Sequence, residues 1–101
     1  MPITTVISNE TAAVTPGTGS DFTTTSRGFW LYAEGFGPGE CAWLQHAGPS
    51  GAFINTTNKD GAIVVGQIPN IVFVDVPAGT YYLGKTVTNL GAYVGYEETG
   101  T

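Results

Sequence analysis

The chain has 101 residues, the size of a single domain, and it holds 15 Gly, 15 Thr and 15 Val or Ile against only four Leu, a composition that favours an all-β fold. It contains eight Asp and Glu but three Lys and Arg, a net charge of −5, which disfavours nucleic acid and polybasic membrane contacts as partners. One cysteine excludes an internal disulfide, and no apolar stretch approaches the roughly 20 residues that span a bilayer.

The first quarter of the chain differs from the rest in its side chains. Residues 1–26 are rich in Thr and have almost no large apolar side chain after Ile7. The sequence therefore predicts an extended N-terminal arm over residues 1–26, with one edge strand at residues 3–8. Residues 27–101 are predicted to form the body of one β-sandwich.

Short β-branched and aromatic runs follow, separated by Gly-rich and Pro-rich turns at the spacing typical of a sandwich or barrel. The predicted strands are residues 27–34, 40–47, 51–56, 62–66, 70–76, 80–88 and 91–98. Residues 70–76 form the most apolar run and are expected to lie in the centre of a sheet. We therefore expect an antiparallel β-sandwich of about seven or eight short strands.

The stretch PAGTYY, residues 77–82, predicts a corner between two strands. Pro77 cannot donate to a ladder, and Gly79 permits a turn that other residues resist. A tyrosine directly after the turn, Tyr81 or Tyr82, can bury its ring while its hydroxyl reaches back to a backbone group. This stretch resembles the corner before the penultimate strands of immunoglobulin-like and fibronectin-like sandwiches, which implies an immunoglobulin-like fold.

The chain as a whole resembles the small immunoglobulin-like structural proteins of tailed-phage virions, which include head decoration and stabilisation proteins. The features that carry the resemblance are the short chain with its Thr-rich start, the segment VPAGTYYLGKT (76–86) and the ending AYVGYEE (92–98). The resemblance implies a non-catalytic protein that is made in the host cytoplasm and resides in the virion. There it would bind the capsid exterior and clamp neighbouring subunits.

Two groups of residues are predicted to contact a partner. If residues 27–34 and 40–47 pair across the turn between them, one face forms a core of Phe29, Leu31, Ala33, Cys41 and Trp43. The opposite face is either covered by a second sheet or exposed as an interaction patch, and it carries Trp30, Tyr32, Leu44 and His46. In the alternative, the two strands belong to different sheets of one sandwich and each buries one side. The second group belongs to the arm, which would lay one face along another protein's sheet edge through Ile3, Thr5 and Ile7.

The expected partner is the major capsid protein or another virion protein, and a homo-oligomer is a further expectation. The alternative function is a carbohydrate-binding or adhesive β-sandwich module. In that alternative, aromatic rings stack on sugars and carboxylates accept hydrogen bonds from sugar hydroxyls. The rings would be those of Trp30, Tyr32 and Trp43, and the carboxylates those of Glu34 or Glu40.

Residues that could carry chemistry are few. Cys41 and His46 are five apart on one predicted strand and so point to opposite faces. Residues 56–67 depart from a calcium-binding loop at its first and last ligand positions. Glu34 and Glu40 flank a turn and could oppose each other as a carboxylate pair, but two solvated acids are the simpler interpretation. We expect no catalytic residue, no metal site and no cofactor.

Overall fold

The computed structural model describes residues 2–99, and this part of the chain is all-β, with 11 strands and no helix. The strands are β1 (Thr4–Glu10), β2 (Asp21–Thr23), β3 (Phe29–Glu34), β4 (Cys41–Ala47), β5 (Phe53–Asn55), β6 (Thr57–Asn58), β7 (Gly61–Ala62), β8 (Val64–Gly66), β9 (Ile71–Val74), β10 (Thr80–Lys85) and β11 (Ala92–Glu98). The prediction of seven or eight strands was too low. The Thr-rich segment adds β2, and residues 53–66 form four short strands rather than two.

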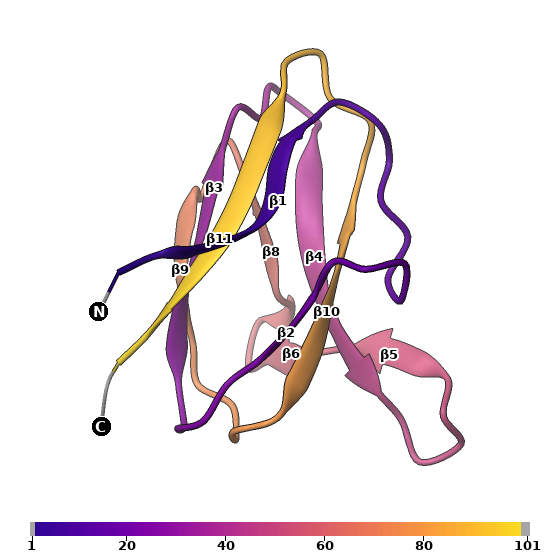
Figure 1. The fold of residues 1–101 in the computed structure, drawn as a ribbon, viewed down its shortest axis with the longest axis vertical. Coiled ribbons are helices and arrows are strands. Elements are labelled where there is room, and N and C mark those ends of the chain that lie inside the picture. The colour runs from indigo at the N-terminus through magenta and orange to yellow at the C-terminus, as the bar shows by residue number, and fades with distance from the viewer. Residues whose placement is uncertain (1, 100–101) are drawn as a thin grey trace.

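The strands form two main antiparallel sheets that lie in separate layers (Figure 1). Sheet A has the order β1-β11-β3-β9, and sheet B has the order β2-β10-β4-β5, with β8 also paired to β4. A small hairpin, β6–β7, stands apart from both. Side chains of both sheets form one core, in which Phe29, Leu31, Leu44, Leu83 and Val94 are fully buried. This arrangement is that of a β-sandwich.

Residues 27–34 and 40–47 do not pair, and the alternative, in which they belong to different sheets of one sandwich, is confirmed. These residues supply β3 to sheet A and β4 to sheet B, so each strand buries one side against the other sheet. On β3 the predicted core residues Phe29 and Leu31 are buried, but on β4 the buried residues are Ala42 and Leu44. The predicted inner and outer sides of β4 are therefore exchanged.

Strand β9, which was expected to be central, lies at the edge of sheet A. Its partner on one side is β3, and the structure places no strand on its other side. Val74 is buried, whereas Ile71 and Phe73 point away from the core and are about half exposed. The apolar composition of this strand therefore reflects two apolar sides, one of them facing solvent.

The Thr-rich segment is integrated into both sheets rather than standing apart as an arm. Strand β1 pairs with β11 at the edge of sheet A, in line with the predicted edge strand, and β2 pairs with β10 in sheet B. Phe22 of β2 is buried and stacks on Tyr96 of β11, with ring centroids 4.3 Å apart. One aromatic side chain thus anchors a segment that is otherwise polar.

The corner before β10 forms as predicted for one tyrosine. The Tyr81 ring is buried, and its hydroxyl donates a hydrogen bond to the Pro77 carbonyl at 2.6 Å. Tyr82 points the other way and packs on Phe53, with ring centroids 4.4 Å apart. Gly79 does not adopt a positive φ, and a Cβ there would meet no atom within 4 Å, so the expected need for glycine at this position is not borne out.

A buried lysine ties the loop before β2 to the sandwich. Lys85, at the end of β10, is 1% exposed, and its ammonium group donates to the Ala12 and Thr86 carbonyls at 2.8 Å each. Backbone hydrogen bonds also join Lys85 and Val14 in both directions. Burial lowers the pKa of Lys85, while Glu10 and Glu40 act in the opposite direction. The two carbonyls replace part of the hydration that the ammonium group loses.

Candidate functional site

The outer face of sheet A gathers a group of apolar side chains that no other element within residues 2–99 covers. The strand register places them in three rows across the sheet, which are Glu97–Trp30–Phe73, Thr5–Gly95–Tyr32–Ile71 and Tyr93–Glu34. We call the apolar members the aromatic face, and they are Ile3, Trp30, Tyr32, Ile71, Phe73 and Tyr93. Apart from the half-buried Tyr32, each is between 37 and 52% exposed. An exposed apolar set of this kind is a candidate interaction surface.

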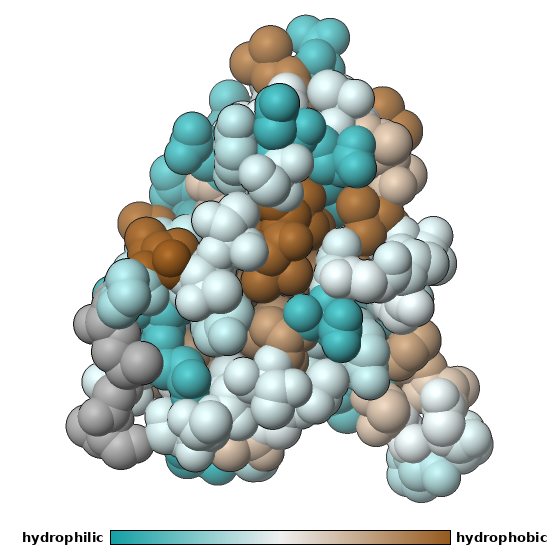
Figure 2. All heavy atoms as spheres, viewed as in Figure 1, coloured by the Kyte–Doolittle hydropathy of each residue, from teal (hydrophilic) through white to brown (hydrophobic). Residues whose placement is uncertain are grey.

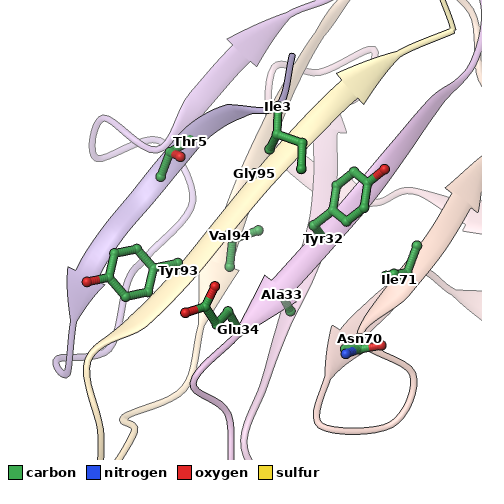
Figure 3. Close-up of a pocket in the computed structure, with 10 residues that line it drawn as sticks. All are labelled: Ile3, Thr5, Tyr32, Ala33, Glu34, Asn70, Ile71, Tyr93, Val94 and Gly95. Atoms are coloured by element: carbon green, nitrogen blue, oxygen red, sulfur yellow. The ribbon is translucent and has the colours of Figure 1, made fainter. Parts of the chain in front are cut away.

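A groove of about 500 Å³ crosses the middle of this face. Its floor includes Gly95 of β11, and Figure 3 shows Tyr32 and Tyr93 on either side of that strand, with Ile3 lying over Gly95. A Cβ on Gly95 would come within 2.8 Å of the Thr4 carbonyl oxygen and 2.9 Å of Ile3 Cγ2. Glycine at this position therefore allows β1 and Ile3 to lie against β11 and form one wall of the groove.

Two of the aromatic rings are held in place by their neighbours. The Tyr32 hydroxyl donates to Glu97 at 2.8 Å, and this hydrogen bond raises the pKa of Tyr32, with burial adding to the effect. Trp30 meets Phe73 edge to face, with ring centroids 5.1 Å apart. Rings that are already oriented lose little conformational entropy when a partner binds. The face is therefore organised before any contact is made.

The charged groups that line the groove or bind its rings are carboxylates, whereas Arg27 pairs with Asp75 at the β9 end of the face. Glu34 is exposed at the rim of the groove, and Glu97 accepts the Tyr32 hydrogen bond. None of the residues that line the groove is Lys, Arg or His. A partner that contributes a cation or a hydrogen-bond donor is therefore favoured over an anionic one.

The structure brings together four of the residues predicted to contact a partner and separates three. Ile3, Thr5, Trp30 and Tyr32 all lie on the outer face of sheet A. Ile7 was expected beside Ile3 and Thr5, but the register of β1 shifts between Thr5 and Ile7, which turns Ile7 into the core at 3% exposure. The bulge reverses the side on which the next residue points.

Leu44 and His46 do not belong to this face, because β4 lies in sheet B. Leu44 is fully buried between the sheets, so the prediction that it contacts a partner is wrong. His46 is half-buried, and its Nδ1 lies 2.7 Å from Thr56 Oγ1. The imidazole thus has a structural partner within the chain.

Sequence reasoning missed three members of the aromatic face, Ile71, Phe73 and Tyr93. Ile71 and Phe73 alternate with Val72 and Val74 along β9, which is a signal for two different apolar sides. Tyr93 alternates in the same way with Ala92 and Val94, both fully buried. The sequence contained this alternation of side chains. Without the strand order, however, it could not show which side of each strand packs against the other sheet.

The other residues with possible chemistry have roles within the fold. The Glu40 carboxylate accepts backbone N–H groups of Gly37 at 2.7 Å and Asn89 at 3.0 Å, and so ties two loops together. The Trp43 ring lies on Gly84 of β10, where a Cβ would collide with it. Among residues 2–99 there is no group of three His, Cys, Asp or Glu side chains that could hold a metal ion.

Comparisons of the chain with protein-family models, with curated proteins and with solved structures returned no match. In the part of the chain that the structure describes, there is also no helix of a length and apolarity suited to crossing a membrane. The functional argument therefore depends on the geometry of the aromatic face.

Proposed function

We propose that this protein is a non-catalytic structural protein of a tailed-phage virion, which decorates or cements the capsid through the aromatic face. The supporting observation is that Trp30 and Tyr93 are exposed on the solvent side of sheet A, with the half-buried Tyr32 beside them. Trp and Tyr are enriched among the residues that dominate binding energy at protein interfaces. The partner would be the major capsid protein or another virion protein, with neither nucleic acid nor membrane involved.

The N-terminal segment contributes to the same surface in this proposal. Ile3 and Thr5 lie beside Gly95 at the edge of the groove, so a capsid subunit that contacts the aromatic face also contacts the start of β1. The role proposed for residues 1–26 is thus narrower than that of a free arm. Many copies on a lattice would convert modest single contacts into high avidity.

An immunoglobulin-like relationship is part of the proposal, and the Tyr81 corner supports it. The strand order departs from that of immunoglobulin domains in one respect. There the last two strands pair in one sheet, whereas here β10 belongs to sheet B and β11 pairs with β1 and β3 in sheet A. We therefore propose that the likeness to immunoglobulin domains is limited to the sandwich and the Tyr81 corner, and does not extend to the last strand, β11.

The test uses purified tailed-phage particles from the lysate in which the chain is made. Mass spectrometry should find the polypeptide in washed particles, and the purified chain should rebind capsids stripped of it. Trp30→Ala should weaken single-site binding on the order of 30-fold, which corresponds to about 2 kcal/mol for a residue of this kind.

Leu90→Ala is the matched control, because Leu90 is an exposed apolar side chain in the loop before β11 and lies outside the aromatic face. It should bind like the wild type, and both variants should unfold cooperatively. Absence of the polypeptide from washed particles, or equal binding by Trp30→Ala and the wild type, would contradict the proposal.

The groove supports a second candidate function, binding of a neutral carbohydrate. Tyr32 and Tyr93 flank the groove, and Glu34 and Asn70 lie at its rim, where they could exchange hydrogen bonds with hydroxyl groups (Figure 3). This set replaces the sequence-based one, because Trp43 and Glu40 lie elsewhere. Calorimetric titration with neutral glycans should show binding that Tyr93→Ala removes, and no heat with any glycan would eliminate this candidate.

A further inference from the structure

The exposed edge of β9 is unusually regular for an unpaired edge. Its four residues, Ile71 to Val74, pair with β3 without a register shift, and none of them is charged, Gly or Pro. Natural sheets usually protect such edges with charges, bulges or proline, because an open edge is a template for pairing with another strand. An edge without these features indicates a strand that is paired in the functional state.

The ladder shows which backbone groups of β9 are available. The Ala33 N–H donates to the Asn70 carbonyl at 2.8 Å, so in an antiparallel ladder every second residue after Asn70, namely Val72 and Val74, points its backbone groups at β3. Ile71 and Phe73 point theirs away from β3. Two N–H and two C=O groups therefore lie in line on the open side.

The other edges of the sandwich are protected. Strand β1 has two register shifts and a residue with positive φ, Asn9, which interrupt its ladder. Strand β2 is three residues long and begins with a charge, Asp21. Strands β5 and β8 are three residues each, and the β6–β7 hairpin separates them. Within residues 2–99, β9 is thus the one uncharged edge strand of four residues or more without a bulge.

The exposed side chains of β9 itself are apolar and uncharged. We call its exposed apolar side chains, Ile71 and Phe73, the β9 wall. The charges that border it pair with each other, Arg27 with Asp75 at 2.8 Å and Lys59 with Asp60 at 3.3 Å. The remaining charges are those of Glu10, Asp21, Glu34, Glu40, Glu97, Glu98 and Lys85, and of these Glu34 lines the same groove as Ile71. Two copies can therefore meet through this wall without juxtaposing unpaired acids of the wall itself.

We propose that β9 pairs antiparallel with β9 of a second copy, about a two-fold axis at Val72. This register places Ile71 of each copy opposite Phe73 of the other, so the outward-pointing backbone groups meet each other. The pairs are apolar and identical on both sides of the axis, as a two-fold interface requires. The two sheets A then form one continuous sheet of eight strands. A hollow of about 410 Å³ lies between the β6–β7 hairpin and the end of β9.

The proposal does not depend on the virion role, because it concerns the chain by itself. Backbone pairing over four residues covers a small area, and a stable interface buries about 1,200 Å² or more. We therefore expect a dimer that dissociates on dilution rather than a permanent one.

The test measures the dimerisation constant of the purified chain by sedimentation velocity and light scattering over a range of concentrations. Phe73→Lys should weaken the dimer at least tenfold, because it places a charge at the pairing edge. Ile3→Lys is the matched control, since it adds the same charge to a half-exposed apolar position at the opposite edge of sheet A. It should change the constant less than threefold.

Amide exchange tests the backbone pairing directly. The N–H groups of Ile71 and Phe73 should exchange more slowly as concentration rises, whereas that of Val72, already paired with β3, should not change. Ile71→Pro removes one outward N–H without removing a bond to β3 and should weaken the dimer, while Ile71→Ala should weaken it less.

Three outcomes would overturn the proposal. One is a monomer at all concentrations up to about 1 mM, which leaves less than about 4 kcal/mol of association. Another is equal weakening by Phe73→Lys and Ile3→Lys, which would place the contact on the aromatic face. The third is protection of the Ile71 and Phe73 amides only when capsids are added, which would make the added strand that of another protein.

Discussion

The Tyr81 corner allows a sharp test of how much one hydrogen bond stabilises this sandwich. In Tyr81→Phe the buried ring is kept and only the hydroxyl that donates to the Pro77 carbonyl at 2.6 Å is lost. A typical hydrogen bond contributes about 0.5–1.5 kcal/mol net, and a buried group left without a partner costs up to about 3 kcal/mol. Pro77 is exposed, so water can replace the hydroxyl and the smaller cost applies. We expect a loss of about 1 kcal/mol.

Tyr82→Phe is the matched control, because it removes the same atom from the next residue, whose half-buried ring packs on Phe53. It should change the free energy of unfolding by less than about 0.5 kcal/mol. Urea denaturation measures both, and thermal melting should show a drop of roughly 4–8 °C for Tyr81→Phe alone. Equal effects of the two variants would refute the reasoning, since the corner would then have no special role.

The pH dependence gives the same test a second readout. Burial raises the pKa of Tyr81 above 10.0, and the charge of Arg27 opposes this only in part. A raised pKa means that the stabilisation is complete below pH 10 and is lost as the pH rises through the folded-state pKa, because the unfolded chain ionises first. The difference in stability between wild type and Tyr81→Phe should therefore narrow above pH 10. A constant difference would contradict the burial of the hydroxyl.

Two further predictions concern sheet A. Gly95→Ala should destabilise the protein by about 1–3 kcal/mol in urea denaturation, because the added Cβ meets the Thr4 carbonyl and Ile3 and must push β1 away; unchanged stability would show that β1 does not lie against β11. Glu98 accepts hydrogen bonds from the backbone N–H groups of Thr25 and Ser26, which hold its pKa below 4.5, so its stabilisation is present above that pH and lost below it. Glu98→Gln should therefore be less stable than the wild type at pH 7, with a difference that shrinks toward pH 3, and a difference independent of pH would contradict this role.

Local features of the fold could be predicted from the sequence, because they depend on neighbouring residues. The alternation in β3 identified Phe29 and Leu31 as core, and the Pro-Ala-Gly-Thr-Tyr order identified the Tyr81 corner. Each of these two patterns can be recognised within a single strand or a single turn. The all-β class followed in the same way from β-branched residues and turn spacing.

Features that depend on strand order could not be predicted in this way. The turn after β3 is short enough for a hairpin, yet β4 crosses to the other sheet, and this exchanged the inner and outer residues of β4. The bulge that turns Ile7 inward also left no mark in the alternation of residues 3–8. Gly84 lies opposite Trp43 on the neighbouring strand, and this pairing can be recognised only when the register is known.

Some apolar side chains on the outside of sheet A are less costly to expose than their number indicates, because neighbouring side chains contact them. Trp30 and Phe73 are in contact, and Tyr32 is hydrogen-bonded to Glu97. In the view of Figure 2, apolar surface is gathered in a few places between hydrophilic side chains rather than spread over the molecule. Solubility and a ready binding surface are therefore compatible in a domain of this size.

Strand β9 can serve both proposed contacts at once, because side chains and backbone groups of a strand point in perpendicular directions. Ile71 and Phe73 place their side chains on the aromatic face and their free N–H and C=O groups in the plane of the sheet. Pairing of two β9 strands would therefore leave the aromatic face open and join two copies of it side by side. In the dimer, two aromatic faces would contact the capsid together and gain from avidity. Phe73→Lys should therefore weaken capsid binding by more than the loss of the Phe73 contact in one copy explains, because it also weakens the dimer.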